Sequence, residues 1–265
     1  MRRALATIFC LLLLPACKSD RVDLSYRFLA DTTNTYRLEA TATARWDIGG
    51  TGRGTYRVTF DVTEQVTSAD EQGAIVSVSM TPTDVSENGL PSPGPDPRSF
   101  VLRLGPNGGV LEVIEVDGVP AAALEPDQLA FIGTYRPPLA PDPVRLGDRW
   151  ESSQQVQLGS VFQEIVTLGE LDGLDRDEQG KKAKLTYQGS GPLVWTTTLP
   201  QGAAELTGSA ETESVATLDL DDGALRTATS TTSGDFEVRV VRDDGRAPIS
   251  GTLHLDLALD LAKVE

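Results

Sequence analysis

The segment TLHLDLALDL, Thr252–Leu261, decides the fold class of this chain. Its leucines occupy every second position, and polar residues or alanine stand between them. Successive side chains of a β-strand point to opposite faces, so this alternation gives one apolar face and one wetter face. Leucine also suits a helix, but the repeat of a helix is about 3.6 residues rather than two. We therefore predict a strand here.

The same period of two recurs along most of the chain from Leu24 onward. Tyr56–Thr63 and Val76–Thr81 alternate apolar with polar residues, and Phe100–Leu104 does so with one exception at Val101. The chain is therefore predicted to be mainly β, built from antiparallel sheets. Further strands are predicted at Val110–Val116, Val161–Leu168, Ala183–Tyr187, Leu193–Thr198, Ser214–Leu220, Ala224–Thr232 and Phe236–Val241.

Turn residues separate these predicted strands. Asn107-Gly108 lies between two apolar runs and indicates a hairpin, because both residue types tolerate positive φ. Asp221-Asp222-Gly223 and Asp243-Asp244-Gly245 are interpreted as hairpin turns on the same ground. Pro91–Pro97 cannot donate backbone N–H groups at its prolines, so it is predicted to be an exposed loop.

Two short matches indicate an internal duplication. Asp70-Glu71-Gln72-Gly73 recurs as Asp177-Glu178-Gln179-Gly180, and Gly109-Val110-Leu111 has a counterpart in Gly223-Ala224-Leu225. The two matches occur in the same order in each half. We expect two related antiparallel halves, arranged as a curved half-barrel or as a sandwich-like pair of sheets, each burying one face.

Residues 120–143 divide the halves, which we place at 24–119 and 144–265. Alanines with Leu124, Leu129 and Ile132 predict one short helix over Ala121–Ile132, with Pro126 suited to its first turn. Pro137–Pro143 follows as a stiff linker. Gly147-Asp148 is then expected to form a tight turn that presents Trp150 at the start of a strand. Trp150 is expected to anchor the core, with an exposed ligand platform as the alternative.

The N-terminus has the layout of a secretory signal over residues 1–16: Arg2 and Arg3, then an apolar run that is too short to span a bilayer. It ends in Leu14-Pro15-Ala16-Cys17, which resembles a bacterial lipobox. That resemblance implies cleavage before Cys17 and a lipid on its sulfur, with residues 17–23 as a short tether. We therefore expect a lipid anchor in the cell envelope, facing the periplasm or the exterior, and in the outer membrane of a diderm cell.

Charge and cysteine content exclude several function classes. Loss of residues 1–16 removes two arginines and no acid, so 21 basic residues remain against 39 acidic ones, a formal charge of −18. Such a surface repels nucleic acid and anionic headgroups. Cys10 leaves with the signal and Cys17 is the expected lipid site, so no thiol remains for a disulfide, a thiolate metal site or a nucleophile. The fold must be held by packing alone.

No residue constellation indicates catalysis, a metal or a cofactor. His254 is the single histidine, and no nucleophile-elbow pattern supplies a serine partner, so we interpret it as a surface residue. Asp219, Asp221 and Asp222 fail the spacing of an EF-hand, because the twelfth residue from Asp219 is Ser230. Trp46, Trp150 and Trp195 are expected in the core, although they could also line a pocket.

The mature chain resembles an uncharacterised family of bacterial lipoproteins. The resemblance rests on the lipobox, the proline-rich linker Pro137–Pro143 and a Leu-Gly-Asp-x-Trp element, here Leu146-Gly147-Asp148-Arg149-Trp150. It implies no activity and no catalytic residues. A looser likeness, at the level of fold alone, is to periplasmic lipoproteins that carry lipid in a curved sheet.

The function expected from the sequence is a non-catalytic, lipid-anchored envelope protein that binds an amphiphilic ligand or an envelope protein. Two alternatives stay open. An acid-dependent hydrolase of envelope polymers would bring two carboxylates with shifted pKa values into one deep cleft. A purely structural surface lipoprotein would have neither a groove nor a cleft.

Overall fold

The computed structural model describes residues 21–124, 136–158, 161–177, 180–199, 202–242 and 244–264. Strands account for nearly all of the regular structure in these ranges, which contain no α-helix. Their bounds are β1 (Thr33–Ile48), β2 (Thr51–Asp70), β3 (Gly73–Glu87), β4 (Leu90–Pro91), β5 (Arg98–Leu104), β6 (Val110–Val116), β7 (Val119–Pro120), β8 (Arg149–Leu158), β9 (Val161–Asp177), β10 (Gly180–Leu199), β11 (Gly202–Asp219), β12 (Leu225–Arg242) and β13 (Ile249–Val264).

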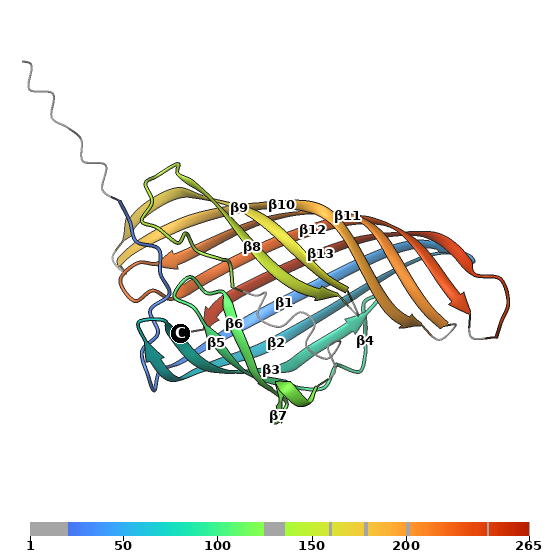
Figure 1. The fold of residues 1–265 in the computed structure, drawn as a ribbon, viewed down its shortest axis with the longest axis horizontal. Helices are drawn as coiled ribbons and strands as arrows, with labels where there is room; N and C mark the ends of the chain where they lie inside the picture. Colours follow the sequence, from blue (N-terminus) through green and yellow to red (C-terminus); the bar gives the residue numbers. More distant parts are fainter. Residues whose placement is uncertain are drawn as a thin grey trace, which may run out of the picture.

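The strands form one 13-stranded antiparallel sheet rather than two packed sheets. Across the sheet the order is β7-β6-β5-β3-β2-β1-β13-β12-β11-β10-β9-β8, with β4 added to β3. The sheet curves so that β8 and β6, near its two edges, face the same side (Figure 1). Of the two expected arrangements, the curved half-barrel is confirmed and the sandwich is wrong.

In both halves, the strands follow one another across the sheet in chain order and in the same direction. Read from one edge to the other, β8 to β13 is followed directly by β1 to β7. The first sequence match lies at the β2–β3 turn and at the β9–β10 turn, and the second lies at the β5–β6 turn and at the β11–β12 turn. These are equivalent turns of two successive meanders, which supports the expected duplication. The halves are joined where β1 pairs with β13 in the middle of the sheet.

The predicted strand Thr252–Leu261 is confirmed as the central part of β13. Its leucines pair across to the even-numbered residues of β1, from Trp46 to Leu38, and so share one face with them. We call this face the core side and the opposite face the outer side. Leu261 belongs to a large buried cluster at one end of the sheet, and Leu253 packs against a second cluster near the other end.

Two segments outside the sheet plug the end where β1 begins. The N-terminal segment contributes Leu24 and Tyr26 to the large cluster, and the segment that begins at residue 136 contributes Leu139 and Val144. The two segments are bonded to each other, because Val22 and Val144 exchange both backbone hydrogen bonds, at 2.7 and 2.9 Å. Leu24, Tyr26, Leu139 and Val144 are all buried. The proline-rich linker therefore covers the core at this end.

A buried ion pair ties this plug to the sheet. The Arg136 guanidinium donates from Nε to Glu64 Oε1 at 3.0 Å and from Nη2 to Glu64 Oε2, and the two side chains are only 4% and 1% exposed. The guanidinium also lies over the rings of Tyr26, at 4.7 Å, and Phe28, at 5.6 Å. Burial raises the pKa of the Tyr26 hydroxyl, so this tyrosine stays neutral beside the pair.

Trp150 anchors the core, as the sequence predicted. It is buried, its Nε1 donates to Pro138 O at 3.3 Å, and its ring meets the Tyr187 ring edge-on at 5.9 Å. Its indole lies on Gly169 of the neighbouring strand, where a Cβ atom would stand 2.4 Å from the ring. The expected turn is present before it, because Gly147 has φ 81° and Asp148 N–H donates to Arg145 O at 2.9 Å.

The helix expected over Ala121–Ile132 is wrong in the part that can be described. Ala121–Ala123 forms a single 3₁₀ turn, and Leu124 is already extended, with φ −96° and ψ 148°. An extended residue cannot continue a helix, so none begins in this stretch. Residues 125–135, with Leu129 and Ile132, lie outside the described residues.

Removing one charge of the buried pair is expected to destabilise the fold strongly. Glu64→Gln should lower the free energy of unfolding by about 3–5 kcal/mol, because Arg136 would keep its charge in a site without water. Urea denaturation followed by tryptophan fluorescence measures this change. The control is Asp61→Asn, whose exposed carboxylate lies 3.8 Å from Arg37 and should contribute about 1 kcal/mol or less. Equal losses in the two variants would contradict the role of the pair.

Candidate functional site

An apolar pocket of about 640 Å³ lies on the core side at the end of the sheet opposite the plug. Its walls come from the ends of five strands: β1 and the four consecutive strands β10 to β13. The lining residues are Trp46, Ile48 and Gly49 from β1 and its turn, Trp195 and Thr197 from β10, Leu206 from β11, Val238 and Val240 from β12, and Ile249 and Leu253 from β13. Thr197 supplies the single side-chain hydroxyl of this lining, so contacts with a ligand would be almost wholly apolar.

Strand register explains why these residues meet. Trp46 stands opposite Leu253, and Trp195 stands opposite Leu206, which in turn faces Val238. Residues directly opposite each other in an antiparallel pair share a face. Each strand therefore adds every second side chain to the same surface. The pocket follows from the alternation that the sequence shows, although the alignment of the strands is needed to assemble it.

Of the two tryptophans of this pocket, Trp46 lies outside the core, contrary to the sequence prediction, whereas Trp195 packs against the second buried cluster. Trp46 is 37% exposed, and Trp195 is half-buried. The Trp46 indole lies across Gly52 of β2, where a Cβ atom would stand 2.4 Å from the ring. The glycine lets the ring lie flat against the strand and form a wall of the pocket.

Close backbone approaches accompany the curvature of the strands in this region. At Gly208 an added Cβ would stand 1.9 Å from the Asp235 carbonyl oxygen, and at Gly251 it would stand 1.9 Å from the Asp47 carbonyl oxygen. No other residue fits such an approach, and glycines of this kind mark bends in sheets. The strands β10 to β13 bend over at this end of the molecule (Figure 1).

The mouth of the pocket carries a paired charge. Arg242 follows Val238 and Val240 at the same period of two, so it continues their face of β12. Its Nε and Nη2 donate to Asp244 Oδ1 at 2.9 Å and Oδ2 at 2.6 Å. Arg246 Nε lies 3.5 Å from Asp244 Oδ2. The hydrogen bonds from Arg242 hold the pKa of the Asp244 carboxyl below its ordinary value, so the group stays ionised.

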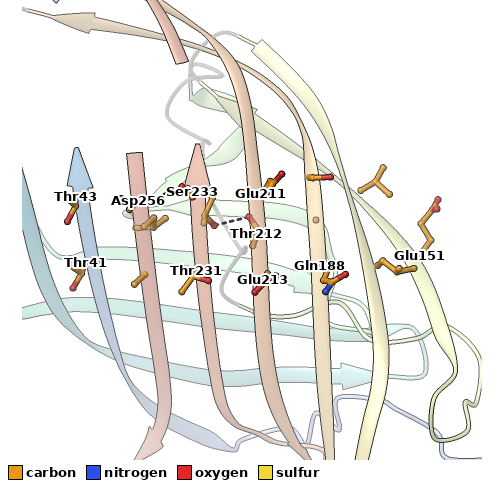
Figure 2. A pocket seen from close by; sticks show the side chains of 17 residues that line it. Thr41, Thr43, Glu151, Gln188, Glu211, Thr212, Glu213, Thr231, Ser233 and Asp256 are labelled. Atoms are coloured by element: carbon orange, nitrogen blue, oxygen red, sulfur yellow. Dashed lines mark hydrogen bonds between the residues drawn. The ribbon is translucent and has the colours of Figure 1, made fainter. Parts of the chain in front are cut away.

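A second hollow, of about 820 Å³, lies on the outer side, and its lining mixes hydroxyl and carboxylate side chains with apolar ones such as Leu168 (Figure 2). Its side chains form two rows across neighbouring strands. One row runs Thr43, Asp256, Ser233, Glu211 and Ser190, and the other runs Thr41, Ala258, Thr231, Glu213, Gln188, Leu168 and Glu151. No lysine or arginine lines this hollow. Its hydroxyls and carboxylates face open water, which makes it a solvated surface.

His254 lies beside this hollow and is held by two carboxylates. Its Nδ1 lies 2.7 Å from Asp235 Oδ1 and its Nε2 lies 3.2 Å from Asp256 Oδ1. The hydrogen bond to Asp235 raises the pKa of the imidazole above its ordinary value of 6.5, because the carboxylate stabilises the charged ring. Ser233 Oγ donates to Asp256 at 2.9 Å rather than to the histidine. The three residue types of a catalytic triad are therefore present, but their bonding is not that of a triad.

The acidic cluster considered for calcium is a self-satisfied turn. Asp219 accepts from the N–H groups of Asp221 and Asp222, at 2.9 and 3.3 Å, and from Arg226 Nη2 at 2.6 Å. Burial opposes ionisation of Asp219, but these hydrogen bonds outweigh it and hold its pKa below the ordinary value. Within the described ranges, no group of three histidine, cysteine or acidic side chains could hold a metal ion.

The apolar pocket was not among the features predicted from the sequence, although part of it was predictable. Trp46 lies just before the glycine-rich turn of a hairpin, and Phe236–Val240 alternates strictly up to Arg242. Large apolar side chains at strand ends, next to flexible turns, leave the buried region unless another segment covers them. That signal would have set Trp46 apart from Trp150, which follows a turn next to the covering linker.

Cys17, the predicted lipidation site, lies outside the described residues. No protein-family model matches this chain, and the search of curated proteins finds no match either. The resemblance to a lipoprotein family therefore stays a prediction. In the part of the chain that the structure describes, no helix is both long enough and apolar enough to cross a membrane.

The raised pKa of His254 can be measured directly, because the chain has one histidine. In an NMR titration its imidazole should titrate above 6.5, and Asp235→Asn should move the midpoint down. A group whose pKa is raised on folding stabilises the fold below its unfolded pKa, and this stabilisation is lost as the pH rises through the folded pKa. Asp260→Asn, on the same face of β13 but exposed, is the control and should leave the midpoint unchanged. A midpoint at 6.5 in the unaltered protein would contradict the assignment.

Proposed function

We propose that this chain is a lipid-anchored, non-catalytic protein of the cell envelope that binds the apolar chain of an amphiphile. The observation that carries the proposal is the pocket between Trp46 and Trp195. It has the size of a small-molecule site, lies on the core side of the sheet and offers almost no hydrogen-bonding side chains. The anchor at Cys17 is the other part of the proposal, and it rests on the lipobox.

The chemistry of the lining selects a hydrocarbon chain rather than a polar ligand. Removing a methylene group from water contributes about 0.8 kcal/mol. A polar group buried in this lining would lose its hydrogen bonds to water, and only the Thr197 hydroxyl, the indole N–H groups of Trp46 and Trp195 and the backbone could replace them. The favourable ligand is therefore one whose chain enters the pocket while its headgroup stays at the mouth, near Arg242 and Asp244.

The titratable groups of the outer side lack the properties that hydrolysis requires, which favours a binding role. A general acid needs a raised carboxyl pKa, whereas the hydrogen bond from Ser233 lowers the pKa of Asp256. His254 has both ring nitrogens occupied by carboxylates, so it is not free to take a proton from Ser233. Neither observation favours the alternative of an acid-dependent hydrolase.

Binding should depend on the two tryptophans of the pocket. Trp46→Ala and Trp195→Ala should each weaken the binding of a fluorescent fatty acid, because either loss removes apolar contact area worth about 1.5–3 kcal/mol, a factor of roughly 10 to 150. Val241→Ala is the matched control, since Val241 is 52% exposed and lies on the opposite face of β12 from Val240. Equal affinity in the Trp46→Ala variant and the unaltered protein would refute this site.

Affinity should also depend on chain length. In isothermal titration with saturated fatty acids, two added methylene groups should strengthen binding by about 1.6 kcal/mol, roughly 15-fold, until the pocket is full. The gain should then stop, because further carbons stay in water. Affinity that does not change between short and long chains would exclude hydrocarbon binding in the pocket.

The anchor is tested separately. Cys17→Ser should release the protein from the membrane fraction into the soluble fraction of its own cells, because no sulfur would remain to carry the lipid. Mass spectrometry of the unaltered protein should show a lipid-modified Cys17 at its N-terminus. If the serine variant stays in the membrane fraction as completely as the unaltered protein, the lipoprotein assignment is wrong.

A further inference from the structure

The expected anchor and the apolar pocket lie at opposite ends of the molecule. The N-terminal segment enters at the plugged end, where Val22 pairs with Val144, and the chain also ends there with β13. The β1–β2 and β12–β13 turns, which border the pocket, lie at the far end (Figure 1). The long axis of the sheet therefore separates them.

Chain lengths show how large this separation is. β1 runs from the plug at Thr33 to the pocket at Ile48, and 16 extended residues rise about 50 Å. Cys17 is four residues before Arg21, the first described residue, and four residues span at most about 14 Å. One leaflet of a bilayer has a hydrocarbon depth of about 15 Å, which is the reach of an acyl chain. The lipid on Cys17 is thus too short to fill the pocket of its own chain.

The negative charge of the outer side also repels an anionic membrane. The outer hollow presents Glu151, Glu211, Glu213 and Asp256 with no basic residue in its lining. The three hairpins around the pocket carry no net charge. Together, residues 44–54, 195–207 and 236–252 contain five arginines and five acidic residues. The whole excess of 18 negative charges lies elsewhere in the mature chain. The pocket end is the part that an anionic amphiphile approaches with the least repulsion.

We propose that the pocket takes its ligand in trans: it accepts the acyl chain of an anionic amphiphile presented to the hairpin end, and not one from the membrane that carries Cys17. This inference rests on the proposed function and adds the source of the ligand. The presenting body is either a second bilayer or a soluble carrier, and both offer the same acyl chain. The protein would then stand on its anchor with the pocket about 50 Å from its own membrane.

The test uses lipidated full-length protein in vesicles and phosphatidylglycerol with one pyrene-labelled acyl chain. Energy transfer from the pocket tryptophans to pyrene reports binding. In the first arm every vesicle carries both protein and probe, and the vesicle concentration is varied. In the second arm the probe is in separate vesicles, and in the third it is delivered on cyclodextrin. Trp46→Ala combined with Trp195→Ala gives the background signal in each arm.

Loading in trans predicts that the rate of the first arm rises in proportion to vesicle concentration, and that at least one of the other arms gives rapid transfer. Transfer from separate vesicles identifies a bilayer as a competent source, and transfer from cyclodextrin alone identifies a soluble carrier. A first-arm rate that does not change with vesicle concentration would overturn the inference, because it would show extraction from the protein's own membrane.

The soluble Cys17→Ser variant separates this inference from the proposed function. If it binds the cyclodextrin-delivered probe while the lipidated protein loads from its own vesicle, binding stands and only the trans source fails. If the soluble variant gives no signal above that of the double tryptophan variant, the pocket binds no acyl chain and both proposals fail together.

Discussion

The pairing of β1 with β13 is the constraint on which the rest of the structure depends. These strands stand opposite each other from Thr35 and Val264 to Ile48 and Gly251, without a register shift. They come from opposite ends of the chain, so their contact joins the two meanders into one sheet. A shift by one residue would turn the leucines of β13 to the water and the aspartates to the core. The register therefore fixes the core and the pocket at once.

The core side of the sheet is covered by other segments at one end and borders a pocket at the other. At the plugged end, the segments with Leu24 and Leu139 cover it, and the buried charge of Arg136 has a full partner in Glu64. At the hairpin end, the same alternation continues past Leu255 into a second buried cluster, which borders the apolar pocket. The row of leucines links the two regions. The described residues contain no cysteine, so no disulfide joins them. The covering segments close one end of the core side, and the apolar hollow lies at the other.

Local pattern was sufficient for most of the strands, for most of the turns and for Trp150, because alternation and turn chemistry are properties of neighbouring residues. It divided β10 and β12 into two predicted strands each, and it did not delimit β1. The correspondence of turns between the two meanders also showed in the sequence, since the two short matches fall at equivalent turns. The pairing of Glu64 with Arg136 did not show, because those residues lie 72 positions apart. The pocket as a whole was not predictable either, because its residues on β1 and on β10 to β13 are also distant in the sequence. Trp46 could not be distinguished from a core residue without knowing which segments cover it. The 3₁₀ turn at Ala121–Ala123 shows that alanine content overstated the helix.

The asymmetry of the fold gives the clearest connection between architecture and the proposed role. The covering segments reach one end of the core side of the sheet, and the apolar pocket lies at the other end. The covering segments are those nearest the expected anchor, since Val22 is only five residues from Cys17. The covered part of the core therefore lies beside the expected anchor, and the hollow lies far from it. A purely structural surface protein has no use for an apolar pocket far from its anchor. A protein that receives an apolar ligand at the end opposite its anchor needs the pocket there.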